Sequence, residues 1–551
     1  MSQKKASNFF QKNTWIIGLL LFSVAGIILG IMGFRGRYTF PDNLYETFRL
    51  FTLNPSSDDI GNSCMLQWAK WLIFAAFILA TFRLFFEIIA PQYFKNLIIK
   101  LFYRKHIIIC GMNEITSSLI KKFGDQKIII ISEETNKYAE TLKAKGKKLL
   151  IGDFSNENLW KKAKLKNASQ LFSVVDSDEV NLQIAQSVFS YSERKRKKVN
   201  ALKCFVLIKD RELKTIMEET VLFKYKTDTF DGSIFNINEM GIKYGIAMNI
   251  DKILPASLET APNILLVGLT EKTAIVLFNM AHCLTISREK FNFTIVEKDT
   301  DAIHIFKMRY TYLFNNDFAT INFVDEIDYE KKYDSIIVCS DNETHAIKQA
   351  VSIRYSLAAA NPNIIVFCNT ADIFSELMEK EDCAQNGSNT LKNRNILLIN
   401  LFEEVANYVF DLESEEGKKL EKHAKEAHHF WNHIYKKNEE WDTMSGHFKQ
   451  SNRNQILDNY IRAYIVLHEK FENITNDSVS LSDEDKETLA RMEHLRWMIE
   501  KFENGWVFGE RNNEFKQHNC LVQWDKLTKE EQEKDKDAIN LMIELLNNQS
   551  K

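Results

Sequence analysis

The chain has 551 residues, of which 45% are hydrophobic, and its formal net charge is −3. This length allows about three or four domains of ordinary size, and the near-neutral charge excludes a general electrostatic attraction to nucleic acid. The eight cysteines form no CxxC pair, so the sequence predicts neither a metal site nor a disulfide framework.

Two apolar segments near the amino terminus predict membrane-spanning helices within a membrane domain that covers residues 1–105. Residues 14–34 carry no charged side chain, and their length matches the roughly 30 Å of a bilayer's hydrocarbon core. The second predicted span covers residues 65–90. Lysine and arginine residues precede the first span and follow the second, which favours a cell inner (plasma) membrane protein with both termini in the cytoplasm. Membrane lipid is therefore an expected partner.

The segment between the predicted spans, residues 41–59, reads as a short amphipathic helix followed by a polar turn. Helix, short helix, turn and helix is the plan of a cation-channel pore. The predicted pore residues are Thr52, Leu53, Asn54 and Pro55, at the place where a potassium filter would carry TVGYG. We therefore expect a pore without strong potassium selectivity. An interfacial helix that conducts nothing is the alternative.

A first α/β domain is predicted over residues 106–250, because β-branched runs alternate there with helix-like segments. A dinucleotide loop would place glycines at 111, 113 and 116, but Gly111 is followed by Asn113 and Thr116. Glu133 lies 22 residues after Gly111, where an acid could bind a ribose hydroxyl. The candidate ligand-binding residues of this domain are Gly111, Asn113, Thr116, Glu133, Gly152 and Asp153.

The same order of elements recurs over residues 251–410, with Gly268 at an offset of 157 from Gly111. A nearly constant offset over several elements indicates a tandem duplication of a Rossmann-like unit. Neither copy keeps all three glycines, so hydride chemistry with NAD is not expected. A regulatory nucleotide in the first copy and a purely structural role both remain open.

A continuous run of about 80 residues, from HIIICG at 106 through GDFSNENLW to VNLQIA, resembles the RCK or TrkA-N domain. This family regulates the conductance of potassium channels and transporters. The resemblance implies binding of a nucleotide or ion, movement of a membrane gate, and rings of eight such units, which two repeats per chain would form in a homotetramer.

The carboxy-terminal region, residues 411–551, is predicted to be a charged linker helix followed by a small, mainly helical module. The order SNR, EHLRW, GW, HNCLVQWD and EKDKDA resembles the RyR repeat named after ryanodine receptors. Arginines and aromatic rings together suit an anionic, base-containing ligand, although a structural network of buried charges is the alternative. The candidate ligand-binding residues are Trp441, Arg453, Arg496, Trp497, His518 and Trp524.

The sequence therefore predicts a two-span, channel-like membrane protein with tandem RCK-like domains and a RyR module. We expect a ligand-gated ion channel or pore that senses a nucleotide-like or other small anionic molecule, not an enzyme and not a nucleic-acid-binding protein. Two alternatives stay open: a membrane-disrupting stress or antiviral effector triggered by a nucleotide second messenger, and a non-conducting regulatory subunit of a cation transporter. The ligand's identity, the ion and the direction of gating do not follow from the sequence.

Overall fold

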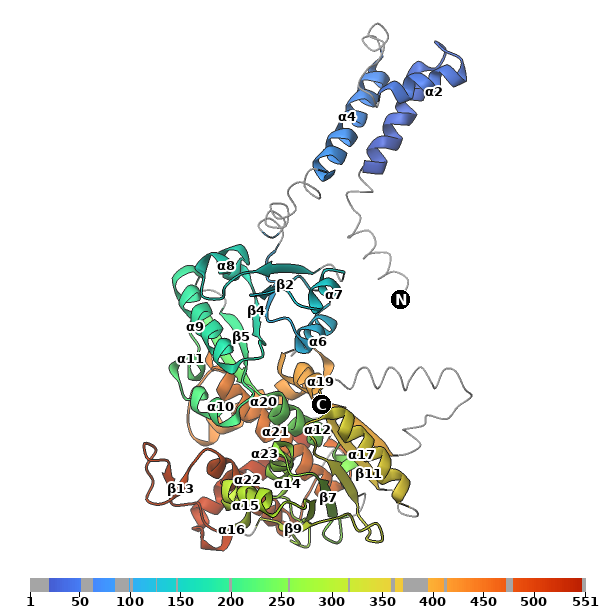
Figure 1. The fold of residues 1–551 in the computed structure, drawn as a ribbon. Coiled ribbons are helices and arrows are strands. Elements are labelled where there is room, and N and C mark those ends of the chain that lie inside the picture. The colour runs from blue at the N-terminus through green and yellow to red at the C-terminus, as the bar shows by residue number, and fades with distance from the viewer. Residues whose placement is uncertain are drawn as a thin grey trace. The chain divides into compact units, whose positions relative to one another are not determined.

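The computed structural model describes residues 19–50, 63–84, 99, 103–124, 126–144, 147–197, 201–255, 258–315, 318–357, 362–369, 395–410, 414–471 and 479–547. The chain divides into two compact units, which we call the amino-terminal unit (Met1–Tyr103) and the large unit (Arg104–Lys551). Their elements are drawn in Figure 1. The division lies within two residues of the domain boundary that the sequence predicts.

The amino-terminal unit is a helical hairpin with a short helix between its arms. The arms are Leu19–Phe34 and α4 (Cys64–Leu84), and the short helix is α2 (Phe40–Arg49). By length and composition, Cys64–Phe82 is long and apolar enough to cross a membrane, whereas Leu19–Phe34 is a shorter apolar helix. The predicted pore residues Thr52–Pro55 lie outside the described residues.

Glycines, two polar groups and a buried apolar cluster face the inside of this hairpin; the cluster consists of Phe34, Leu50, Leu66, Ala69 and Ile73. A Cβ atom on Gly30 would lie 2.7 Å from Cγ2 of Thr47, so the first arm and α2 touch closely there. Asn43 is buried, and its amide donates a hydrogen bond of 3.1 Å to the carbonyl of Ile31. Asn43 and Thr47 of α2 therefore point inward.

Large apolar side chains cover the outside of the same hairpin. In α2, Phe40, Tyr45 and Phe48 are exposed. The exposed apolar residues of the two arms are Leu20, Leu21, Phe22, Val24, Ile28, Met32, Met65, Trp68, Trp71, Phe77, Leu79 and Phe82. A water-soluble helical unit has a mostly polar outside, so this apolar outer surface is atypical of one.

The first α/β domain contains a parallel six-stranded sheet in the order β3-β2-β1-β4-β5-β6. Its strands are β1 (Ile107–Cys110), β2 (Ile128–Ser132), β3 (Lys148–Ile151), β4 (Gln170–Ser173), β5 (Leu202–Leu207) and β6 (Phe230–Phe235). Its helices are α6 (Glu114–Lys122), α7 (Tyr138–Ala144), α8 (Glu157–Lys162), η3 (Leu165–Asn167), α9 (Asp178–Lys195), α10 (Arg211–Glu218), α11 (Val221–Lys224), α12 (Ile237–Met248) and α13 (Ile250–Ile253). The isoleucine runs of β1 and β2 are buried because helices cover both faces of a parallel sheet.

The second α/β domain repeats this topology with the sheet order β12-β11-β10-β7-β8-β9. Its strands are β7 (Asn263–Val267), β8 (Asn292–Val296), β9 (Thr320–Val324), β10 (Ser335–Val338), β11 (Asn363–Cys368) and β12 (Ile396–Asn400). Its helices are α14 (Glu271–Met280), α15 (Thr300–Arg309), α16 (Thr311–Asn315), α17 (Glu343–Ser356), α19 (Leu401–Val405) and the π-helix η5 (Ala406–Phe410). Counted within each domain, both orders read 3-2-1-4-5-6, the Rossmann order, so the predicted tandem repeat is confirmed.

The two repeats pack against each other through the helices that follow their last strands. α12 lies on α19, and a Cβ on Gly241 would come within 2.7 Å of Leu401. The rings of Tyr244 and Tyr408 stack with centroids 5.1 Å apart. Phe410, at the end of the second repeat, lies 5.0 Å from the ring of Phe205 in the first sheet. Each repeat therefore completes part of the other's core.

The carboxy-terminal region is mainly helical, as the sequence predicts. Its elements are α20 (Glu415–Ile434), η6 (Trp441–Thr443), α21 (Gly446–Leu467), α22 (Asp483–Glu503), β13 (Val507–Phe508), β14 (Gln517–His518), η8 (Trp524–Lys526) and α23 (Lys529–Asn547). α20 packs on α21 and α22 packs on α23, while α21 also contacts α12 and α22 contacts α14. This region therefore packs against both α/β domains (Figure 1).

Candidate functional site

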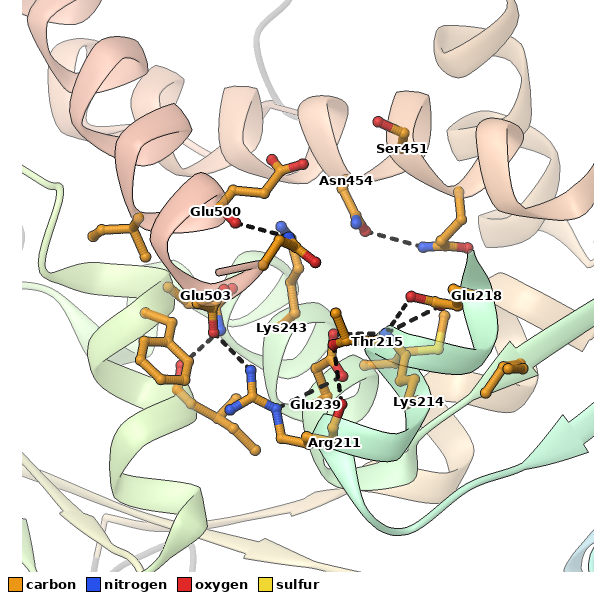
Figure 2. A pocket seen from close by; sticks show the side chains of 18 of the residues that line it. Arg211, Lys214, Thr215, Glu218, Glu239, Lys243, Ser451, Asn454, Glu500 and Glu503 are labelled. Carbon is orange, nitrogen blue, oxygen red and sulfur yellow. Dashed lines mark hydrogen bonds and ion pairs between the residues drawn. The ribbon is translucent and has the colours of Figure 1, made fainter. Parts of the chain in front are cut away.

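A cavity of about 590 Å³ lies where the two α/β domains and the carboxy-terminal region meet (Figure 2). Its walls come from α10 and α12 of the first repeat, α14 and α16 of the second, and α21 and α22 of the carboxy-terminal region. No sequence motif marks this place, because the residues that line it are spread along the chain from Phe205 to Lys516. Basic and acidic side chains line it in equal number.

The first-repeat wall carries a cluster of buried ion pairs. Arg211 donates from Nη2 to Glu503 at 2.6 Å and lies with Nε 3.7 Å from Glu239. Lys214 contacts Glu239 at 3.1 Å and Glu218 at 3.2 Å. Burial disfavours charge on Lys214, but these two carboxylates raise its pKa above the ordinary value. The pairs therefore join α10, α12 and α22 around the cavity (Figure 2).

At two carboxyl groups of the cavity, the effect of burial on the pKa outweighs the effect of the nearby cations. Burial raises the pKa of Glu503, although Arg211 acts in the opposite direction. Burial also raises the pKa of Glu271, which lies in the first turn of α14. The ionised form of a carboxyl group in such an environment has a higher free energy than in water.

A second group of charges connects the far wall to α12. Lys243 lies 3.5 Å from Asp458 on α21, and Nε of Arg496 on α22 lies 3.7 Å from the same carboxylate. Asp458 is 1% exposed. Burial opposes its ionisation, but Lys243 and Arg496 lower its pKa below the ordinary value. This carboxylate therefore links the first repeat to both helices of the carboxy-terminal region.

His282 is a buried polar group on the cavity wall, just after α14. Its side chain is 1% exposed, and within the described residues its Nδ1 has no hydrogen-bond partner. Burial lowers its pKa to about 4, so the ring is neutral at pH 7. Buried polar atoms without partners are rare and call for a physical explanation.

The structure brings two of the six candidate residues of the RyR region to this cavity, namely Arg453 and Arg496. Both are already paired. Arg453 contacts Glu421 at 2.7 Å, and Arg496 contacts Glu493 at 3.0 Å. Their guanidinium groups therefore join helices of the carboxy-terminal region through ion pairs.

The other four candidates do not line the cavity. Trp441 is buried and donates to Glu421 at 3.2 Å, and Trp524 is buried beside His494, with ring centroids 6.0 Å apart. Trp497 and His518 meet edge to face at 4.9 Å. The structure thus does not bring all six residues around this cavity, and most of these rings pack within the helical module.

At the carboxyl edge of the first sheet, Gly111, Asn113 and Thr116 share one loop. Gly111 has φ +121°, and a Cβ there would lie 2.9 Å from the carbonyl oxygen of Val174, so glycine is needed. Asn113 caps α6 through Thr116 and donates to the Val174 carbonyl at 2.7 Å. Its side chain therefore bridges β1 and β4, where a second glycine would leave room for a pyrophosphate.

The remaining candidates of the first repeat follow the neighbouring strands. Glu133 is exposed directly after β2. The backbone N–H of Gly152 donates to Ser132 at 3.0 Å, which joins the ends of β3 and β2. Asp153 accepts from the backbone and hydroxyl of Ser155 at 2.7 and 2.8 Å, and these bonds lower its pKa. Asp153 therefore stabilises a turn.

In the second repeat, a buried lysine occupies the corresponding edge. Lys272 is 2% exposed, and its ammonium donates to the carbonyls of Ser340 and Phe367, both at 3.1 Å. These carbonyls follow β10 and end β11. The crevice next to Gly268 is thus filled by a side chain that the sequence comparison of the repeats does not reveal.

Comparison with known proteins gives two family matches. Residues 107–221 match the TrkA-N domain model, and residues 473–549 match the RyR domain model. No curated protein matches the chain. Among solved structures, the GsuK channel is 13% identical (73% of this chain, 99% of that chain, TM-score 0.36). GsuK bound to ADP is 13% identical (74% and 98%, TM-score 0.36), and the human SLO3 gating ring is 9% identical (57% and 85%, TM-score 0.38).

The matched ranges fall where the sequence motifs lie. The TrkA-N match begins at β1 and ends at the start of α11, and the RyR match includes α22 and α23. Together with the repeated sheet order, these matches support tandem RCK/TrkA-N-like α/β domains followed by a RyR-like module.

Proposed function

We propose that the chain is a subunit of a ligand-gated ion channel or pore of the RCK-regulated potassium-channel type. In this proposal the amino-terminal unit spans the inner (plasma) membrane, and the large unit senses a small ligand in the cytoplasm. The subunit assembles as a homotetramer, both termini are cytoplasmic, and the protein is not an enzyme.

The observation that carries the proposal is the apolar outer surface of the hairpin in the amino-terminal unit. Apolar side chains cover its outside, whereas Asn43 and Thr47 are buried inside. In water this arrangement would expose a large apolar surface, but in lipid the same surface is the favourable one. Close packing at glycines is also typical of helix contacts in membranes.

Vesicle flux tests this role of the hairpin. We expect Gly30→Leu to reduce cation flux through reconstituted protein to near background, because a Cβ already meets Thr47 at 2.7 Å. Ile28→Leu, on the exposed side of the same helix, is the matched control and should conduct normally. If Gly30→Leu conducts like Ile28→Leu, the packed hairpin is not part of the conducting structure.

The wild-type protein also separates the alternatives in this assay. A large leak without ion preference would favour the membrane-disrupting effector, and absence of flux would favour the non-conducting regulatory subunit. We expect ligand-dependent flux without strong potassium selectivity.

We further propose that a regulatory nucleotide binds at the Gly111 end of the first repeat. The filled crevice beside Lys272 supports the first repeat over the second. Because Asn113 bridges β1 and β4, nucleotide binding there requires its bond to Val174 to open.

Matched glutamates after the second strand of each repeat test this assignment. We expect Glu133→Ala to weaken ADP binding about tenfold or more, the effect of losing a hydrogen bond to a charged group. Glu297→Ala should leave the affinity unchanged, because Glu297 accepts bonds from the backbone of Lys298 and Asp299. Calorimetric titration of the full chain measures both. The opposite pattern would place the nucleotide in the second repeat.

A further inference from the structure

We propose that the cavity between the three parts of the large unit is a second binding site, for a ligand of the nucleotide class. It adds to the sensing role proposed above and is distinct from the crevice at Gly111. At about 590 Å³, the cavity lies within the roughly 300–1,000 Å³ of small-molecule sites.

The cavity contains cationic donors whose hydrogen-bonding capacity is only partly used. Within the described residues, the ammonium of Lys243 makes one ion pair, at 3.5 Å to Asp458, although it has three N–H groups. Nε of Arg211 has no hydrogen-bond partner in the same part of the chain, and its ion-pair partner Glu239 lies 3.7 Å away. Both residues line the cavity, so a compact anionic group can bind there without displacing Asp458 or Glu503.

His282 provides a second polar group for a ligand in the cavity. Its buried Nδ1 has no partner among the described residues, and the ring lines the same cavity. A hydrogen bond from a ligand would satisfy this atom. Since His282 is neutral at pH 7, it contributes polarity and direction, whereas the positive charge comes from Arg211 and Lys243.

Aromatic rings form one wall of the cavity. Phe278, Tyr312 and Phe502 all line the cavity. The rings of Phe278 and Tyr312 stack with centroids 6.1 Å apart, and those of Tyr312 and Phe502 at 5.7 Å. Arg211 lies over the ring of Phe278 at 4.7 Å. Cationic donors beside aromatic rings fit a phosphate joined to a planar base.

The acidic residues restrict the size and charge of the ligand. Glu218, Glu239, Glu500 and Glu503 all line the cavity, so a long polyanion such as nucleic acid would be repelled. A mononucleotide or dinucleotide presents only one to three phosphates. Because the walls belong to three domains, such a ligand would tie α12 to α21 and α22 and favour one arrangement of them.

The experiment uses the full chain in detergent, with AMP, ADP, ATP and NAD as probes and inorganic pyrophosphate and adenosine as partial ligands. Ser451 is exposed on α21 and lines the cavity (Figure 2). We expect Ser451→Trp to block the site and weaken binding of the preferred nucleotide at least tenfold, about 1.4 kcal/mol. Asn452→Trp, one position along and not among the lining residues, is the matched control and should bind like the wild type.

Two further variants test the proposed ligand contacts. Lys243→Met should weaken binding of nucleotides and pyrophosphate but not of adenosine. His282→Phe should weaken nucleotide binding without lowering the melting temperature, because it removes a buried unpartnered nitrogen. Glu133→Ala tests nucleotide binding at the Gly111 crevice alone. Loss of binding at one site can therefore be distinguished from loss at the other, and neither measurement depends on conductance. If no nucleotide binds, or if Ser451→Trp binds as tightly as Asn452→Trp, the proposal is overturned.

Discussion

Acidification from pH 7 to pH 5 is expected to destabilise the large unit strongly, before most carboxylates titrate. His106, His282 and His423 are at most 8% exposed, and burial lowers the pKa of each to about 4 from 6.5. The unfolded chain therefore takes up protons first as the pH falls through this interval. Their stabilising contribution is complete above pH 6.5 and is lost towards pH 4, at about 2 kcal/mol per histidine by pH 5.

The midpoint of urea unfolding of the full chain at pH 7, 6 and 5 measures this effect. Glu271 and Glu503, whose pKa values burial raises, act in the opposite direction, so the variant comparison is decisive. His282→Phe should reduce the loss of stability between pH 7 and pH 5 by the contribution of one histidine. His304→Gln, at an exposed position, should leave that loss unchanged. Equal stability at pH 5 and pH 7 would show that the three rings are already protonated or accessible when folded.

The second large effect is expected at the buried ion pair between α21 and α22. Arg462 is fully buried, with an ion pair to Glu493 and a bond of 2.6 Å to Asn459. Glu493→Gln leaves the buried guanidinium without that charge, and we expect a loss of about 3–5 kcal/mol in unfolding free energy. Glu487→Gln on the same helix removes a half-exposed partner of Arg491 and should cost at most about 1 kcal/mol.

Chemical denaturation of both variants provides the comparison. Replacing the pair by apolar residues, Arg462→Met with Glu493→Leu, should recover much of the stability, because no buried charge is left without its partner. Similar losses for Glu493→Gln and Glu487→Gln would mean that water reaches Arg462 in solution.

The sequence predicts the repeated domains well because their information is local and periodic. Buried isoleucine runs, a glycine after the first strand and a nearly constant offset are enough to indicate two Rossmann-like sheets. Asn113 was also recognisable as the side chain that would occupy the pyrophosphate position, and in the structure it bonds to Val174.

The three-domain cavity is not predictable in the same way. Arg211 and Glu503 are 292 positions apart, and nothing in either neighbourhood indicates that they meet. The inserted Phe410 and the buried Lys272 likewise depend on tertiary packing. For the RyR region, residue types identified Arg453 and Arg496 at the cavity, but they did not distinguish a ligand contact from an internal ion pair.

Single-channel recording tests the central claim most directly. The full chain is reconstituted into planar bilayers, and current is measured before and after nucleotide is added to the side that carries the large unit. We predict discrete current steps whose open probability changes with nucleotide, and a reversal potential away from the potassium equilibrium value in mixed sodium and potassium. Absence of discrete steps with and without nucleotide, for protein confirmed to be inserted, would contradict the claim.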